Sequence, residues 1–308
     1  MVRQRSAKPL SAGSIPAVAS RIPLPKSFSF QSTVESHGWY RLAPFRWENG
    51  VLRRAETLPD GTVDLEITAT KTALVVKGAA DSSELRKRIA RMFQLDLDLA
   101  DFVARARDSE VHAWVEAACF GRLLCGATLW EDAVKIIETT NTMWRQTVRM
   151  NELLVEKCGR RSPSGRAAFP LPEDVAKFSA AELQNDCRLG YRAKSIHALA
   201  TGIADGSIDL DAIANPMQST EELFKSYRML PGIGPYGAAH LLAMDGRHDF
   251  IAVDTEFRRF VRERYHKGRS VSDRTMLRRY SKWGRWKYLA YWSELWSSVA
   301  DRLVEPAQ

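Results

Sequence analysis

Two glycines and one aspartate in the C-terminal third of the sequence are suited to binding an anion and acting on it. Gly232 and Gly234 flank Ile233, and Pro235 follows at a position suited to the first turn of a helix. A tight turn of this kind points free backbone N–H groups and a helix N-terminus outward, which makes a binding site for phosphate. Asp254 follows after one helix and a short loop, so a phosphate bound at the turn would lie near its carboxylate.

Helical patterns on both sides of the turn would hold it in place. Residues 219–228 read as a short amphipathic helix and residues 235–245 as an apolar one, which together give a helix-hairpin-helix unit that binds DNA. The Gly-x-Gly pattern also fits an ordinary connection between helices. Likewise, a helix expected over 255–266 would begin directly after Asp254, so this residue could simply cap that helix.

The chain divides into a strand-rich and a helical part. Alternating runs at 28–34, 63–68 and 73–77, separated by turn residues such as Pro59-Asp60-Gly61, predict strands. From Asp81 onward the period is helical. We therefore expect a mostly α protein of the α+β class, with an N-terminal antiparallel sheet and a two-lobed helical body.

The expected boundaries follow from this change of pattern. They are a disordered basic tail over 1–27, a sheet-containing domain over 28–110 and a helical domain over 111–308. A first helix should end at Met92. Further helices are expected at about 96–107, 128–139, 142–157, 179–186, 191–203, 219–228, 235–245, 255–266, 272–282 and 285–302.

Charge favours an anionic partner. The 308 residues carry a net charge of +8, and the stretch from Glu256 to Tyr288 holds twelve lysines and arginines against three acids. A basic face directly after the hairpin and its acid suits binding to double-stranded DNA. A solvated basic surface is the alternative interpretation.

Composition also bears on the cellular location of the protein and on metal binding. No apolar run is long enough to span a membrane, and the first 27 residues lack the apolar core of a secretory signal, so we expect an intracellular protein, cytoplasmic and nucleoid-associated or nuclear. The four cysteines are scattered, none follows Asp254, and no His/Cys cluster has zinc spacing.

The hairpin and acid resemble a known family. Residues 230–238 with Val253-Asp254-Thr255 are similar to the helix-hairpin-helix/Gly-Pro-Asp superfamily of DNA base-excision glycosylases. Residues 92–99, 137–144 and 189–194 resemble, in the same order, its 8-oxoguanine and 3-methyladenine branches. The match covers roughly 28–303 and implies excision of a damaged base from duplex DNA.

The resemblance implies how the reaction runs. Asp254 would stabilise the oxocarbenium-like sugar and activate water. Tyr236 stands where bifunctional members carry a lysine that forms a Schiff base, which implies a monofunctional hydrolase, although Lys282 or Lys287 could substitute. The absence of cysteines after Asp254 argues against the iron–sulfur branch, so no cofactor is expected.

The resemblance also assigns binding residues. The DNA phosphate would bind at the hairpin residues Gly232, Ile233, Gly234, Tyr236 and Gly237. Family members hold a monovalent cation on hairpin carbonyls, which would correspond to Leu230 and Gly232 and to K⁺ or Na⁺.

A wedge and a base pocket complete the predicted site. Asn141 would fill the hole left by the flipped base, or it could be the N-cap of the helix over 142–157. The base pocket is predicted from Tyr236, His240, Tyr288 and Trp292. The alternative for His240 is a hydrogen-bonded core histidine, and the alternative for the aromatic stripe is core packing, as we expect for Trp296.

Three functions remain open at this point. The first is a monofunctional glycosylase acting, as a monomer, on alkylated purines such as 3-methyladenine, with deaminated bases as a further substrate class. The second is an 8-oxoguanine-type glycosylase without the usual lysine. The third is a non-catalytic helix-hairpin-helix protein that only binds DNA.

Overall fold

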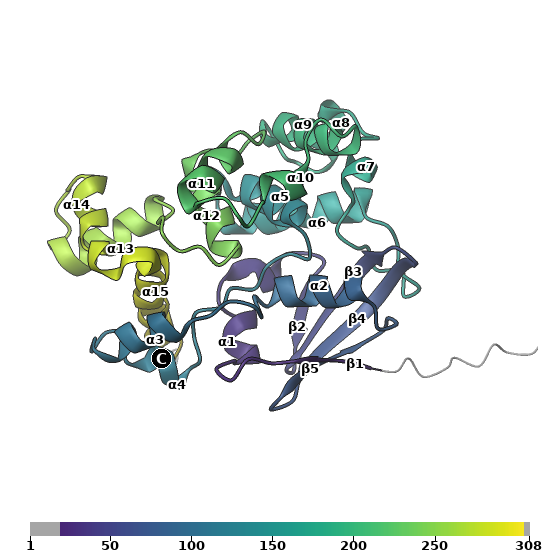
Figure 1. Cartoon of the computed structure of the whole chain (residues 1–308). Coiled ribbons are helices and arrows are strands. Elements are labelled where there is room, and N and C mark those ends of the chain that lie inside the picture. The colour runs from purple at the N-terminus through teal and green to yellow at the C-terminus, as the bar shows by residue number, and fades with distance from the viewer. Residues whose placement is uncertain (1–18, 305–308) are drawn as a thin grey trace, which may run out of the picture.

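The computed structural model describes residues 19–304, and these form a five-stranded antiparallel sheet joined to two groups of helices (Figure 1). The predicted mostly α architecture with an N-terminal antiparallel sheet is confirmed. Within the described residues, none of the helices combines the length and apolar character needed to cross a bilayer. Most of the predicted tail, residues 1–18, lies outside the described part of the chain.

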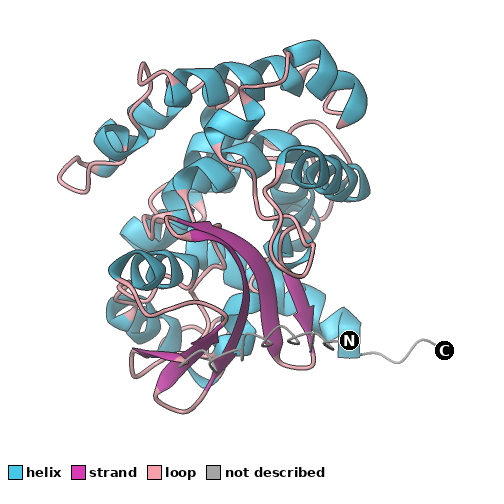
Figure 2. Cartoon of the chain, turned by 90° about the vertical axis from the view of Figure 1, so that its right-hand side faces the viewer, coloured by secondary structure: helices cyan, strands magenta, loops and turns pink. Residues whose placement is uncertain are grey.

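The sheet has the strand order β1-β5-β4-β3-β2. Its turns follow from local sequence: Leu58 pairs with Gly61 across the two-residue turn Pro59-Asp60, as predicted, and Asn49 and Gly50 adopt positive φ between β2 and β3. The strands are β1 (Ser20–Pro23), β2 (Arg46–Glu48), β3 (Val51–Leu58), β4 (Gly61–Ala69) and β5 (Ala73–Lys77). In Figure 2 the strands curve beneath the helices.

Two predictions for the N-terminal part are wrong. Residues 20–23, placed in the disordered tail, form β1 and pair with β5. The run 28–34, predicted as a strand, contains helix α1 (Phe30–Val34), because the Ser29 side chain accepts a hydrogen bond from the Ser32 N–H and caps it. The elements that follow in this part are η1 (Gly38–Arg41) and α2 (Ser83–Met92).

The first group of helices stands above the sheet in Figure 1 and carries the hairpin between its last two members. Its members are α5 (Leu129–Thr139), α6 (Trp144–Cys158), α7 (Pro172–Val175), α8 (Ala180–Asp186), α9 (Arg192–Ala204), α10 (Leu210–Ile213), α11 (Thr220–Arg228) and α12 (Pro235–Met244).

The second group combines C-terminal helices with two from the middle of the chain. Its members are α3 (Ala100–Arg107), α4 (Trp114–Ala117), α13 (Thr255–His266), α14 (Asp273–Arg278), η2 (Ser281–Trp286) and α15 (Lys287–Val304). Phe102 of α3 packs against Trp283 and Trp286, and the Trp286 indole N–H donates to Asp101. Helix α3, which precedes the predicted domain boundary at residue 110, therefore packs against the C-terminal helices.

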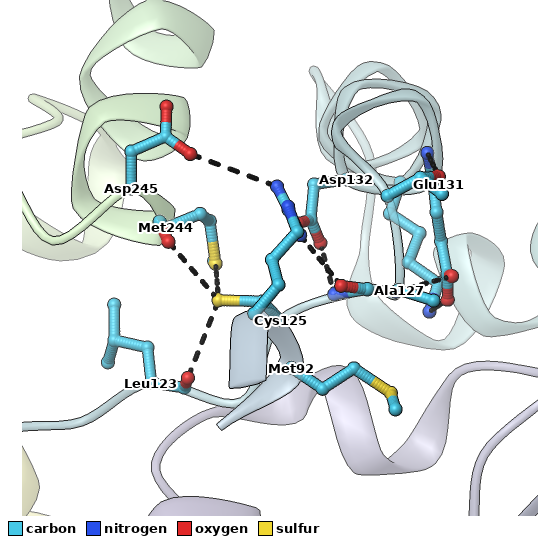
Figure 3. A network of polar contacts seen from close by, with 12 residues as sticks. Met92, Leu123, Cys125, Ala127, Glu131, Asp132, Met244 and Asp245 are labelled. Carbon is cyan, nitrogen blue, oxygen red and sulfur yellow. Dashed lines mark hydrogen bonds and ion pairs between the residues drawn. The ribbon is translucent and has the colours of Figure 1, made fainter. Parts of the chain in front are cut away.

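Glu131 and Asp132 of α5, both labelled in Figure 3, belong to a buried charge network that reaches the sheet and α2. Glu131 accepts hydrogen bonds from Arg54 of β3 at 2.9 and 3.2 Å, from Lys135 at 2.7 Å and from the Ala127 N–H at 2.9 Å. The neighbouring Asp132 pairs with Arg91 of α2 at 2.6 Å and receives the Trp39 indole N–H at 2.8 Å. These contacts fix the N-terminal part against α5, the helix that leads to Asn141.

Candidate active site

The hairpin between α11 and α12 presents unpaired amides. Gly232 has φ +81°, and a Cβ there would lie 2.7 Å from the Cβ of Ser195, so both its conformation and its surroundings require glycine. Within the described residues, the amides of Gly232 and Gly234 have no partner in the protein. Both residues are exposed, and a Cβ on Gly234 would meet nothing within 4 Å. The turn is therefore open to an anion on this side.

Asp254 both caps a helix and lines a cavity. Its Oδ1 accepts the Phe257 N–H at 2.7 Å and caps α13, as the simpler interpretation predicted. The same carboxyl also lines a cavity, so its function as a cap does not take it out of the site. Burial raises the pKa of the Asp254 carboxyl above its ordinary value, and the Phe257 N–H opposes that rise.

The cavity has a volume of about 1050 Å³ and lies between the sheet-containing part and both helical groups. It brings together side chains that are far apart in the sequence. Asn141, Tyr236, His240, Asp254, Tyr288 and Trp292, all predicted as site residues, line it, together with Gly234 and Gly237 of the hairpin. Gly232 and Ile233 are not among the lining residues, and Ile233 is buried beneath the turn.

Aromatic rings form one wall of the cavity. The centroids of Tyr236 and His240 are 4.5 Å apart, those of His240 and Tyr288 are 6.0 Å apart, and Tyr288 stacks on Trp292 at 5.8 Å. The indole N–H of Trp292 donates to the Ser36 carbonyl at 2.9 Å. Trp292 is therefore anchored to the N-terminal part rather than free to rotate.

His240 is electrically neutral near pH 7. Burial lowers its pKa to about 3, and the structure gives it no hydrogen bond within the described residues. The prediction of a hydrogen-bonded core histidine is therefore wrong, because the ring lines the cavity instead. A neutral imidazole without a partner can donate one hydrogen bond and accept another.

Asn141 does not cap the following helix. It has φ +47° and its Nδ2 donates to the Tyr191 hydroxyl at 3.2 Å, while Met143 occupies the N-cap position of α6. The N-cap interpretation is wrong because α6 begins two residues later than that interpretation requires. The side chain is exposed at the edge of the cavity, and its role as a wedge stays a prediction.

The two lysines named as substitutes for a Schiff-base lysine lie outside the cavity. Neither Lys282 nor Lys287 is among the residues that line the cavity, and the described lining contains no lysine at all. The Tyr236 hydroxyl lies 3.5 Å from Thr139 Oγ1, and burial raises its pKa above the ordinary value. Tyr236 is therefore a neutral phenol on the wall of the cavity.

Sequence reasoning missed the contribution of the N-terminal part. His37, Gly38 and Trp39 line the cavity, as does Trp144 at the start of α6. The His37 Nε2 lies 2.7 Å from the Leu124 carbonyl, and burial lowers its pKa to about 4, so this histidine is also neutral near pH 7. No spacing in the sequence connects residue 37 with residue 254, because only the tertiary packing brings them together.

The pH dependence of the reaction should follow Asp254. A carboxylate mechanism needs this group ionised, so the rate should fall as the pH drops through its raised pKa, with a midpoint above 3.8. His37 and His240 should add no step near pH 6.5, since their pKa values are about 4 and about 3. Single-turnover rates, corrected for spontaneous base loss, would check this, and a rate that did not fall as the pH was lowered to 3.8 would contradict it.

Comparisons with known proteins agree with this geometry. Residues 134–285, about half of the chain, match the model of HhH-GPD superfamily base excision DNA repair proteins. The chain belongs to this superfamily. No curated protein sequence matches it significantly.

Two solved structures show the same fold over nearly the whole chain. A 3-methyladenine DNA glycosylase from Archaeoglobus fulgidus has a TM-score of 0.74 at 19% identity, covering 90% of this chain and 98% of that one. An 8-oxoguanine glycosylase/lyase from Clostridium acetobutylicum, solved with double-stranded DNA containing cytosine opposite 8-oxoguanine, has a TM-score of 0.72 at 17% identity, covering 93% and 99%. Both DNA glycosylase branches named by the sequence resemblance therefore share this fold.

Proposed function

We propose that the protein is a monofunctional DNA glycosylase that flips a damaged base into the cavity and hydrolyses its N-glycosidic bond. One observation carries this proposal: Asp254 and Tyr236 line the same cavity, and none of the described residues that line it is a lysine. A tyrosine cannot form an imine with the sugar, so water is the nucleophile.

The geometry gives Asp254 a defined task. As the bond to the base breaks, positive charge develops on the sugar, and a nearby carboxylate in a partly buried site stabilises that charge. The same carboxylate orients water or removes its proton. Because the Phe257 N–H holds Oδ1, the carboxyl group is fixed in orientation before the substrate arrives.

Double-stranded DNA is the partner that fits the charged surface. The unpaired amides of the hairpin would receive one phosphate, and exposed cations after Asp254 would contact others. Arg258 is paired with Asp273, and Arg259 with Glu256 and Glu263, but several basic residues of the stretch are exposed: Lys267, Arg269, Arg274, Arg278 and Lys282. The acids of this stretch therefore leave most of its positive charge available.

A monovalent cation fits the hairpin carbonyls. The Gly232 carbonyl has no partner within the described residues, and that of Leu230 accepts only the Ile233 N–H at 3.0 Å. K⁺ or Na⁺ held there would add positive charge beside the phosphate. We propose no iron–sulfur cluster or other cofactor for the reaction.

The proposed substrates are alkylated purines such as 3-methyladenine. Electron-rich rings line the cavity, and both of its histidines are neutral near pH 7, so a positively charged alkylated base would meet stacking surfaces rather than repulsion. Such a base is also a good leaving group, so its release needs less catalytic assistance. The 8-oxoguanine branch is the second candidate, because a structure of that branch shares the fold.

A panel of duplexes tests the proposal. Duplexes carrying 3-methyladenine, hypoxanthine, uracil or 8-oxoguanine are incubated with the protein, and strand breaks are measured with and without hot alkali. We expect breaks at 3-methyladenine only after alkali. Breaks without alkali would contradict the monofunctional mechanism, release of 8-oxoguanine alone would favour the second candidate, and binding without base release would indicate a non-catalytic DNA-binding protein.

Gly234→Asp tests the hairpin. The position is open, its φ of −89° suits any residue, and aspartate is a good N-cap, so α12 should still form. The added negative charge should weaken binding to all duplex sequences and reduce the salt dependence of affinity by about one phosphate contact. Binding titrations at several salt concentrations would measure this. Ser219→Asp, which adds the same charge at the N-cap of α11, is the control, and an unchanged salt slope for Gly234→Asp would count against the phosphate site.

A further inference from the structure

Gly38 of the N-terminal part and Trp144 of the first helical group are in close contact, and both line the cavity. Gly38 begins η1 in the N-terminal part, and Trp144 is the first residue of α6. A Cβ on Gly38 would lie 2.5 Å from Cζ2 and 2.6 Å from Cη2 of the Trp144 ring. The indole edge therefore occupies the space that any side chain at position 38 would need.

Backbone conformation does not explain the glycine. Gly38 is not among the described glycines with positive φ, so another residue could adopt its backbone angles. The reason for glycine at this position is therefore the close approach of the indole. Gly38 is in this sense a positioning residue for Trp144.

The indole of Trp144 is placed for an external ligand. It is 36% exposed, it lines the cavity that contains Asp254, and within the described residues it makes no hydrogen bond and no ring contact. The other tryptophans of the cavity are anchored, since Trp39 donates to Asp132 and Trp292 donates to the Ser36 carbonyl. A large apolar ring left half-exposed at a cavity is suited to stacking on a planar partner.

We propose that Trp144 stacks on the flipped base and determines which bases are accepted, with Gly38 holding its ring in position. This inference rests on the proposed glycosylase function and deepens it by assigning a residue outside the helical wall predicted from the sequence. Because a positively charged base interacts more strongly with an indole face than a neutral base does, Trp144 should favour cationic alkylated bases.

The test compares single-turnover release of 3-methyladenine and hypoxanthine by five variants, and it also measures the affinity of each variant for duplex containing an abasic site. Trp144→Ala should slow 3-methyladenine release about tenfold, the effect of one lost stacking contact, and slow hypoxanthine release less. Its affinity for abasic duplex should be unchanged, because that DNA places no base in the cavity. Trp144→Phe should restore most of the rate.

Gly38→Ala should resemble Trp144→Ala, since the new methyl group displaces the indole. The double variant should be no slower than Trp144→Ala alone, because the group that the methyl displaces is already gone. Met143→Ala is the matched control: Met143 is the exposed neighbour of Trp144, and it does not line the cavity, so it should leave release unchanged.

Each other outcome would overturn the inference. Unchanged release by Trp144→Ala, or an equal loss on abasic duplex or with Met143→Ala, would show that the indole does not contact the base. Additive effects of Gly38→Ala and Trp144→Ala would show that Gly38 does not position the indole. Failure of the proposed function looks different, because the wild-type protein would then release neither base in the same assay.

Discussion

Replacing Asp254 with asparagine is expected to slow base release by about 10²–10⁴-fold, the usual contribution of a positioned acid–base group. Asparagine keeps the size of the side chain and can still accept the Phe257 N–H, so the cap of α13 should persist. Affinity for DNA and thermal stability should therefore stay close to those of the wild type. Single-turnover release and a melting curve of the same preparation would measure both properties.

A matched variant separates the two roles of this aspartate. Asp209 caps α10 in the same way, with Oδ1 accepting the Ala212 N–H at 3.0 Å, but it does not line the cavity. Asp209→Asn should leave base release unchanged. If Asp254→Asn also kept the wild-type rate, Asp254 would be a cap and no more, and the proposed mechanism would be wrong.

Of the substitutions proposed here, Glu131→Gln should lower the free energy of unfolding most, by about 3–5 kcal/mol. Removing this carboxylate leaves the buried positive charges of its partners uncompensated. Arg54, Lys135 and Glu131 are all fully buried, and the substitution would leave Lys135 without its carboxylate at 2.7 Å. Urea unfolding of the two proteins would measure the difference. The exposed pair of Arg149 and Glu152 supplies the control, since Glu152→Gln should cost less than about 1 kcal/mol.

The contribution of Glu131 should depend on pH in a defined direction. Burial alone would raise its pKa, but the charges of Arg54 and Lys135 outweigh burial and lower it to about 2. A depressed pKa in the folded state stabilises the fold above the unfolded-state value of 4.5, and this contribution is lost as the pH falls toward 2. The stability difference between wild type and Glu131→Gln should therefore shrink below pH 4.5, and a constant difference would contradict the role of the charge.

Local sequence signals predicted the helices on either side of the candidate site. The Gly-x-Gly turn, Pro235 at the first turn of α12 and Asp254 before α13 are all decided by residues close in sequence, and the structure has each element where it was expected. The strand predicted at 28–34 failed because one side-chain cap at Ser29 and the packing of Phe30 against Trp47 and Phe93 outweigh the alternating pattern.

Contacts between distant segments were beyond such signals. The charges of Glu131 and Asp132 on α5 resemble those of a solvated helix face, yet their partners lie on β3 and α2 and bury them completely. The wall formed by residues 37–39 is a consequence of the same packing. It places the N-terminal part in the site, although the hairpin and the acid gave no indication of it.

Borohydride trapping would show whether the protein forms a Schiff base with the sugar. Wild-type protein is incubated with duplex containing 3-methyladenine in the presence of sodium borohydride, and the products are separated without alkali. We expect free 3-methyladenine, an unbroken strand with an abasic site and no protein–DNA adduct, because Tyr236 cannot form a Schiff base. A reduced covalent adduct, or a strand broken before alkali is added, would contradict it.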